Sequence, residues 1–183
     1  VTVAPPPSAP STIDVQITLN AERWTYVSFN VVPTDASLSA VLGNDPSLVQ
    51  RIITQGGAAE YIPTLGWIGG LSQASIVPNR LYKIYSPSGG TLHINGVLPE
   101  TVQYNFNVGW TWIGIPLSTD SMPLSNFLVG TWQPNDRIIS SSEYGGAFTF
   151  DGVTWNGPLQ DIRRGVGYVV YRANGGDVVY TTN

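Results

Sequence analysis

The sequence predicts a mainly β protein, made of two homologous β-sandwich-like or barrel-like units in tandem. We expect a pseudo-two-fold relation between the units and one or two short helices in each. Three observations predict this class. Apolar and polar residues alternate in several short segments, as in half-buried strands. The 20 glycines and 14 prolines divide the chain into short elements. Most of the chain also repeats once.

The repeat extends over aromatic, aliphatic and basic positions alike. Most matched residues are 86 positions apart, as in 110 − 24, and the offset widens to 88 at one pair (155 − 67). We therefore predict units at 13–98 and 99–183 with one shared strand connectivity. The clearest pairs are Trp24 and Trp110, Leu38 and Leu124, Arg51 and Arg137, Trp67 and Trp155, and Tyr82 and Tyr168.

The elements of the two copies are predicted in parallel. Strict alternation, or enrichment in aromatic and β-branched residues, predicts the strands. Apolar i, i+4 spacing after Asp35 or Asp120 predicts a helical turn in each copy. Paired glycines at 89–90 and 175–176 predict tight turns that close a hairpin in each copy. The expected strands are 13–19, 24–32, 52–53, 81–85 and 91–94, then 102–108, 110–117, 138–139, 168–171 and 177–180, with helical turns at 38–42 and 124–128.

Residues 1–12 read V-T-V-A-P-P-P-S-A-P-S-T. Proline at this density prevents a helix and favours an extended polyproline segment. We expect a Pro-rich strap in which Pro5, Pro6 and Pro7 contact a neighbouring copy. Deleting the strap should then weaken assembly and leave each subunit folded.

Charge is sparse. Charged residues make up 11% of the chain, against about 25% in ordinary soluble domains, and Lys83 is the single lysine. Either neighbours cover the surface, or the surface binds a polar, uncharged ligand such as a glycan. A net charge of −4 argues against nucleic acid, which calls for a basic stripe. Cysteine is absent, and no apolar run approaches the ~18 residues of a membrane span.

Catalytic motifs are not evident. His93 is the single histidine and lies in an alternating segment, where it is expected to be a surface residue. Without a cysteine or a second histidine, most nucleophile–base and metal arrangements cannot form. Acidic candidates for glycosidase chemistry exist, but no motif pairs them. The acidic candidates are Glu60, Asp136, Glu143, Asp151 and Asp161. We predict no enzyme, no cofactor and no metal site.

Aromatic residues divide into expected core and expected contact positions. Recurrence in both copies predicts a structural core of Trp24, Tyr26, Tyr82, Trp110, Trp112 and Tyr168. Truncating Trp24 or Trp110 should then cost ~3–5 kcal/mol. Assembly or ligand contacts are expected from Trp67 and Trp155 in Gly-rich loops and from Trp132, which has no aromatic counterpart.

The repeat resembles a tandem Trp-x-Trp β-repeat family of bacterial surface proteins and algal proteins. The segments that carry the resemblance are G-W-T-W-I-G at 109–114, D-R-I-I-S at 136–140, Q-R-I-I-T-Q at 50–55, G-W-I-G-G-L at 66–71 and R-L-Y-K-I at 80–84. Within the family, a two-copy chain with extended termini is most similar to the pyrenoid shell proteins of diatoms. The family supplies no catalytic residues.

The resemblance implies a role in assembly or at a surface. It implies copies of the chain as partners, Rubisco-condensate proteins as further partners, and a place at the pyrenoid periphery in the chloroplast stroma. Without it, an extracellular or cell-surface location is expected. We therefore predict a structural protein that assembles into a sheet or shell. The alternative is a secreted or surface carbohydrate-binding module that uses the loop tryptophans.

Overall fold

The computed structural model describes residues 12–128, 130, 132–140 and 146–182. The predicted strap, with Pro5, Pro6 and Pro7, lies outside the described residues. The first unit contains β1 (Thr12–Leu19), β2 (Arg23–Val27), β3 (Val32–Pro33), α1 (Leu38–Leu42), β4 (Arg51–Thr54), β5 (Gly57–Ile62), β6 (Gly66–Ile68), β7 (Tyr82–Ser86) and β8 (Gly90–Val97). The second contains β9 (Thr101–Phe106), β10 (Gly109–Gly114), β11 (Ser121–Pro123), α2 (Leu124–Phe127), β12 (Arg137–Ile139), β13 (Ala147–Phe150), β14 (Trp155–Asn156), β15 (Asp161–Arg163), β16 (Gly167–Arg172) and β17 (Gly176–Thr181).

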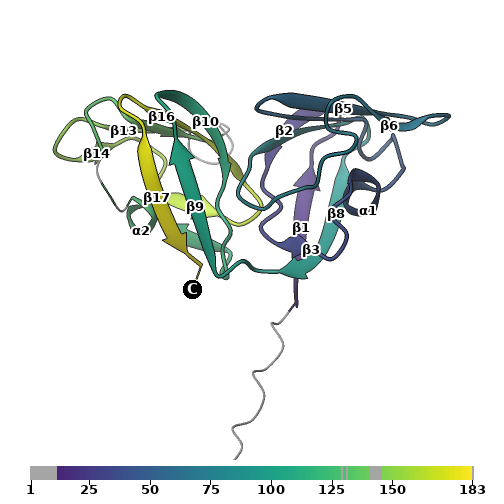
Figure 1. Cartoon of the computed structure of the whole chain (residues 1–183), viewed down its shortest axis with the longest axis horizontal. Helices are drawn as coiled ribbons and strands as arrows, with labels where there is room; N and C mark the ends of the chain where they lie inside the picture. The colour runs from purple at the N-terminus through teal and green to yellow at the C-terminus, as the bar shows by residue number, and fades with distance from the viewer. Residues whose placement is uncertain (1–11, 129, 131, 141–145, 183) are drawn as a thin grey trace, which may run out of the picture.

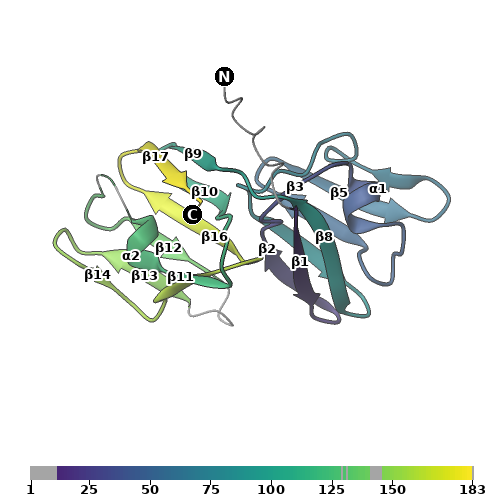
Figure 2. The ribbon, with the colours of Figure 1, turned by 90° about the horizontal axis from the view of Figure 1, so that it is seen from below.

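Each unit is a sandwich of a five-stranded antiparallel sheet and a smaller sheet (Figure 1). The five-stranded sheets run β2-β7-β4-β5-β6 and β10-β16-β12-β13-β14. The first and last strands of each unit form the opposing layer, as β1 with β8 and β9 with β17; β1 and β8 lie in front of the larger sheet in Figure 2. The mainly β class is confirmed, and the two five-stranded sheets have the same strand order. The smaller sheets differ, because β3 pairs with β8 in the first unit and β11 pairs with β15 in the second.

A separate core fills each sandwich. The first gathers buried side chains from Val15 to Ile94, and the second gathers them from Val102 to Tyr180. Alternation in β1 points Val15, Ile17 and Leu19 inward, as the sequence predicts. Tyr82 and Tyr168 are also buried, at 2% and 0% exposure, so their assignment to the core is confirmed.

The predicted hairpins at the glycine pairs are wrong. β7 pairs with β2 and β4, whereas β8 pairs with β1 and β3, so the turn between β7 and β8 carries the chain from one layer to the other. Gly89 (φ 69°) lies against Leu19 and Ala21, where a Cβ would be 2.9 Å from the Ala21 nitrogen. The turn therefore needs glycine for a close approach to β1 as well as for positive φ.

The first helix begins at Leu38 as predicted, and its N-cap lies two residues after Asp35. Ser37 is the N-cap of α1, and its side chain accepts a hydrogen bond from the Ala40 N–H. Asp35 instead accepts a hydrogen bond from the Ser37 N–H. The helix is therefore capped by the residue next to its first turn, as capping geometry requires.

The two units meet around a pseudo-two-fold axis. A two-fold axis brings equivalent positions into contact with each other. Ser28 and Gly114 are equivalent (114 − 28 = 86), as are Leu81 and Gly167 (167 − 81 = 86), and each pair is in contact across the junction. A Cβ at Gly167 would lie 2.6 Å from Cγ of Leu81. The predicted pseudo-symmetry therefore places the closest packing at its axis.

Backbone and amide hydrogen bonds reinforce the junction. The Ser28 N–H donates to the Gly165 carbonyl at 2.9 Å. The fully buried Asn30 side chain donates to the Leu117 carbonyl at 3.0 Å and accepts from the Leu117 N–H at 2.6 Å. The Asn30 amide thus bonds both the N–H and the carbonyl of Leu117, as an opposing strand residue would. The two units are therefore joined by hydrogen bonds as well as by apolar contacts.

Replacing Gly114 with alanine should lower the free energy of unfolding by about 1–3 kcal/mol, the usual cost of overpacking. The added methyl would meet Oγ of Ser28 and lie 2.5 Å from the Pro78 carbonyl oxygen, which is backbone and cannot rotate away. Urea denaturation measures the loss. Gly70→Ala is the matched control, because a Cβ there has no neighbour within 4 Å. Equal midpoints for the two variants would contradict the close packing at the axis.

Candidate assembly surface

The outward face of the first five-stranded sheet carries a continuous row of large side chains. Trp24 lies opposite Tyr85, Tyr85 opposite Arg51, Arg51 opposite Glu60, and Glu60 opposite Ile68. Directly opposed residues share a face, so the row crosses all five strands. We call it row 1 (Trp24, Tyr85, Arg51, Glu60 and Ile68).

The side chains of row 1 hold one another in place. Trp24 is 40% exposed, and its ring centroid lies 5.5 Å from that of Tyr85 at an interplanar angle of 51°. Arg51 Nε lies 3.1 Å from a Glu60 carboxylate oxygen. A hollow of ≈ 440 Å³ lies beside the row, lined by Trp24, Arg51, Ile53, Ala58, Ala59, Glu60, Ile68 and Gly69.

The second unit repeats the row. Trp110, Tyr171, Arg137, Thr149 and Asn156 lie opposite one another in the same order; we call them row 2. Trp110 is 45% exposed, and its ring centroid lies 5.1 Å from that of Tyr171 at 57°. The duplication has therefore retained Trp, Tyr and Arg on an outward face in both units.

The prediction that Trp24, Tyr26, Trp110 and Trp112 are core residues is wrong. In β2 the inward positions are Thr25 and Val27, so the alternation places Trp24 and Tyr26 outward. Trp110 and Trp112 are outward in β10 for the same reason, with Ile113 inward. Tyr26 and Trp112 are half-buried, and the Lys83 side chain lies over both rings. Recurrence in both copies indicates that these rings have a role, but it does not show whether they face the core or the outside of the sheet.

The outward faces meet in a shallow groove at the junction. The groove has a volume of ≈ 660 Å³ and contains side chains from both units. Lys83 lies between two equivalent rings, with Nζ 4.5 Å from the Tyr26 centroid and 4.4 Å from the Trp112 centroid. We call this site the junction groove; it is lined by Tyr26, Lys83, Trp110, Trp112, Ile139, Ser140 and Val169.

The pseudo-symmetry explains why a single lysine lies there. Val169 occupies the position equivalent to Lys83 (169 − 83 = 86) and lines the same groove. Two ammonium groups beside the axis would repel each other, whereas one can bind both ring faces. Lys83 is therefore a cation–π link between the units.

The Gln55 side chain forms hydrogen bonds with the unpaired edge of β10. Its Nε2 donates to the Trp110 carbonyl at 2.8 Å, and its Oε1 accepts from the Trp112 N–H at 2.9 Å. These two backbone groups are thereby satisfied by a side chain of the other unit. An exposed sheet edge is a template for a further strand, and this contact blocks that template at Trp110 and Trp112.

The predicted contact tryptophans lie in a different environment from the one expected. Trp67 is 9% exposed and donates its indole N–H to the Gly43 carbonyl at 3.1 Å. Trp132 is 8% exposed and lies 5.1 Å from Trp155, which also stacks on Phe148. The prediction is wrong for Trp67 and Trp132, and Trp155 is half-buried. Trp67 and Trp155 lie in strands β6 and β14 rather than in loops, and both rings pack on aromatic neighbours, Trp67 on Tyr61 and Trp155 on Phe148.

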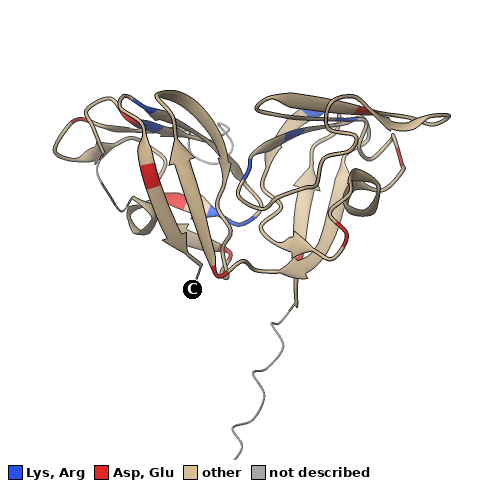
Figure 3. Cartoon of the chain, in the orientation of Figure 1, with Lys and Arg blue, Asp and Glu red and all other residues tan. Residues whose placement is uncertain are grey.

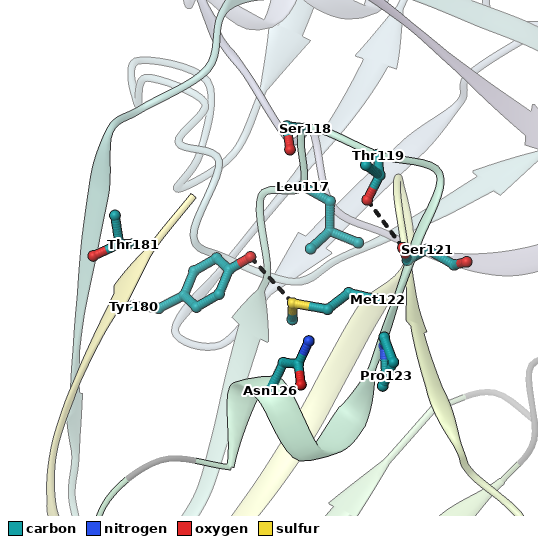
Figure 4. Close-up of a pocket in the computed structure, with 9 residues that line it drawn as sticks. All are labelled: Leu117, Ser118, Thr119, Ser121, Met122, Pro123, Asn126, Tyr180 and Thr181. Atoms are coloured by element: carbon teal, nitrogen blue, oxygen red, sulfur yellow. Dashed lines mark hydrogen bonds between the residues drawn. The ribbon is translucent and has the colours of Figure 1, made fainter. Parts of the chain in front are cut away.

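A second hollow lies in the second unit, between the 117–123 segment, α2 and β17 (Figure 4). Its volume is ≈ 370 Å³, and its polar groups are mainly hydroxyls and one amide. The Tyr180 hydroxyl donates to the Met122 sulfur at 3.4 Å, and burial raises the pKa of Tyr180. The hydroxyl stays protonated at neutral pH, so this hollow can donate hydrogen bonds but supplies no base.

Three of the five acidic candidates for catalysis have structural partners. Glu60 pairs with Arg51, and Asp136 is buried beside Arg172. Asp151 accepts hydrogen bonds from its own turn, and His93 lies 3.7 Å from Asp14 on an exposed sheet face. Glu143 lies outside the described residues. Across the described ranges, no three His, Cys, Asp or Glu residues group as metal ligands, and no helix is long and apolar enough to cross a membrane.

Charged residues are scattered over both units (Figure 3). Three aspartates stabilise turns or caps, and the pKa of each is lowered by hydrogen bonds. Asp151 accepts from the Thr154 and Val153 N–H groups, Asp35 from the Ser37 N–H, and Asp45 from the Ser47 hydroxyl and N–H. Hydrogen bonds to the ionised form favour it over the protonated form.

We expect stability to fall in acid. The pKa of each of these aspartates is lower in the folded chain than its ordinary value of about 3.9. As pH falls toward that value, the unfolded chain therefore binds more protons than the folded chain. The stabilisation is therefore complete above about pH 5 and is lost as pH falls through the folded pKa values. Urea midpoints measured on either side of this window test the sign. Asp151→Asn, which retains an acceptor, should reduce the slope; an intact chain equally stable across the window would contradict the assignment.

Comparison of the chain with protein-family models, curated proteins and solved structures found no match. Membership of the Trp-x-Trp repeat family therefore stays a prediction from the motifs.

Proposed function

We propose that the chain is a structural protein that assembles with copies of itself into a sheet or shell through the outward faces of its two units. The observation that carries the proposal is the duplicated outward Trp, Tyr and Arg in rows 1 and 2. These three residue types are the ones most enriched among residues that dominate protein–protein binding energy. Trp24 and Trp110 are each partly exposed and held by a tyrosine.

A second copy of the chain is the partner that the surface favours. Two similar but inequivalent faces on one chain make it bivalent, and contacts that do not close a ring continue to grow. The charge content of 11% leaves little electrostatic repulsion between copies. Enclosure of a Rubisco-containing pyrenoid, and a chloroplast location, rest on the resemblance alone.

Carbohydrate binding is the second candidate. It is supported by the exposure of Trp24 and Trp110, rather than by the loop tryptophans, of which Trp67 and Trp132 are buried. The ring pairs in rows 1 and 2 are tilted by 51° and 57°, so neither forms a flat platform. This geometry suits interlocking side chains of a protein better than the flat face of an extended polysaccharide.

Sedimentation velocity of the pure chain over a range of concentrations tests the proposal. We expect large particles above a critical concentration, and ordered sheets or tubes by electron microscopy. A chain that stays monomeric at high concentration and is retarded on a polysaccharide gel would contradict assembly and support the carbohydrate-binding alternative.

A further inference from the structure

In the described part of the chain, the cation of the junction groove has no acidic partner. Among the described residues that line it, Lys83 alone is charged, and its ammonium lies against two aromatic faces. Within the residues that the structure describes, no carboxylate lies in salt-bridge range of Lys83. The rest of the lining is mainly aromatic and aliphatic. A complementary ligand would therefore join an apolar side chain to a carboxylate.

The turn between β13 and β14 has this combination. It reads Asp151-Gly152-Val153-Thr154, and Val153 is 90% exposed. The Asp151 carboxylate accepts hydrogen bonds from the Val153 and Thr154 N–H groups at 2.8 Å and from the Asn156 amide at 2.9 Å. These bonds fix the turn before any docking, which reduces the entropy lost on binding. We call these four residues the acidic tip.

The equivalent turn of the first unit is apolar but not acidic. Leu65 occupies the position of Val153 (153 − 65 = 88) and is 68% exposed, but Pro63 stands where the acidic tip has Asp151 (151 − 63 = 88). Charge complementarity to Lys83 therefore selects the second unit's turn over the first's.

The acidic tip cannot reach the groove of its own chain. It connects β13 and β14 at the outer end of the second unit, whereas the groove lies at the junction of the two units (Figure 1). Any such contact must come from another copy.

We propose that the acidic tip of one copy docks in the junction groove of the next, with Val153 against the groove's aromatic wall and Asp151 beside Lys83. This contact rests on the proposed function and names the surfaces that would meet. It joins two different surfaces, so it propagates head to tail. Gln55 already satisfies the backbone of β10 at the groove, so the tip docks through side chains and does not add a strand.

Two variants separate the two sides of the contact. Val153→Lys places a cation on the tip opposite Lys83 and should raise the critical concentration for assembly by about tenfold or more. Val169→Glu places a carboxylate beside Lys83 within the groove, at a half-buried position, and should do the same. Leu65→Lys is the matched control: it carries the same change on the other exposed turn and should assemble like the intact chain. Urea midpoints report whether each variant folds.

Mixing the two variants is the decisive experiment. The Val169→Glu chain keeps an intact tip and the Val153→Lys chain keeps an intact groove, so in sedimentation an equimolar mixture should associate at concentrations where neither variant associates alone. A Val153→Lys chain that assembles like the intact one would overturn the contact and leave the proposed function standing. Equal loss of assembly in Leu65→Lys and Val153→Lys would overturn it too, because added charge alone would explain both. A monomeric intact chain would overturn the proposed function itself.

Discussion

The double variant Trp24→Ala, Trp110→Ala should lose assembly while keeping its fold. Truncating one central interface tryptophan typically costs ~2 kcal/mol or more of binding free energy, which is about 30-fold in affinity. Each ring is nearly half exposed in the monomer and packs mainly on one tyrosine. The free energy of unfolding should therefore change by only about 1 kcal/mol per site.

Trp67→Ala is the matched control for this prediction. Trp67 is 9% exposed and links β6 to the end of α1 through the hydrogen bond to the Gly43 carbonyl, so its truncation should lower the free energy of unfolding by ~3–5 kcal/mol. The outward rows are untouched by this change. If the double variant lost as much stability as Trp67→Ala, or assembled at the same concentration as the intact chain, the assignment of Trp24 and Trp110 to a binding surface would be wrong.

Asp136→Asn should be among the most destabilising substitutions in the second unit. Arg172 Nε lies 3.0 Å from an Asp136 oxygen, and the two side chains are 4% and 0% exposed. The Asp136 carboxylate also accepts from the Gln133 and Ala173 N–H groups at 2.8 and 2.7 Å. Removing one charge of a buried pair leaves the other uncompensated and typically costs 3–5 kcal/mol, so we expect a loss of about that size.

The first unit supplies a control for this buried pair. Gln50 and Ser86 occupy the positions equivalent to Asp136 and Arg172, so the pair belongs to the second unit alone (136 − 50 = 86; 172 − 86 = 86). The exposed pair Arg51–Glu60 should contribute roughly 0–1 kcal/mol, and Glu60→Gln should change the urea midpoint little. Similar losses for Asp136→Asn and Glu60→Gln would show that the buried pair is not an important source of stability.

The repeat allowed the connectivity to be predicted from sequence. The offset of 86 aligned β2 with β10, β4 with β12 and β7 with β16, and the two large sheets have the same strand order. The layer change between β7 and β8 could not be predicted, because a Gly-Gly turn is compatible with a hairpin and with a crossing between sheets. Long-range pairing of β1 with β8 decides between them, and no local signal encodes that pairing.

None of the tryptophans predicted as contact residues lies in row 1 or row 2, and the two tryptophans that do were predicted to be core residues. An alternating strand such as 24–27 shows that Trp24 and Tyr26 share one face, but not which face is inside. Thr25 is an uncommon core residue, and it takes the inward position because Val27 does. Arg51 and Arg137 were the available signal: they recur beside the aromatic residues, and an arginine in the middle strand of a sheet marks its solvent face.

Footprinting of tryptophan side chains by oxidation, in the dilute monomer and in the assembled state, tests the central claim most directly. The account predicts that Trp24 and Trp110 react in the monomer and become protected on assembly, while the buried Trp67 is protected in both states. Assembled particles in which Trp24 and Trp110 react as they do in the monomer would contradict it.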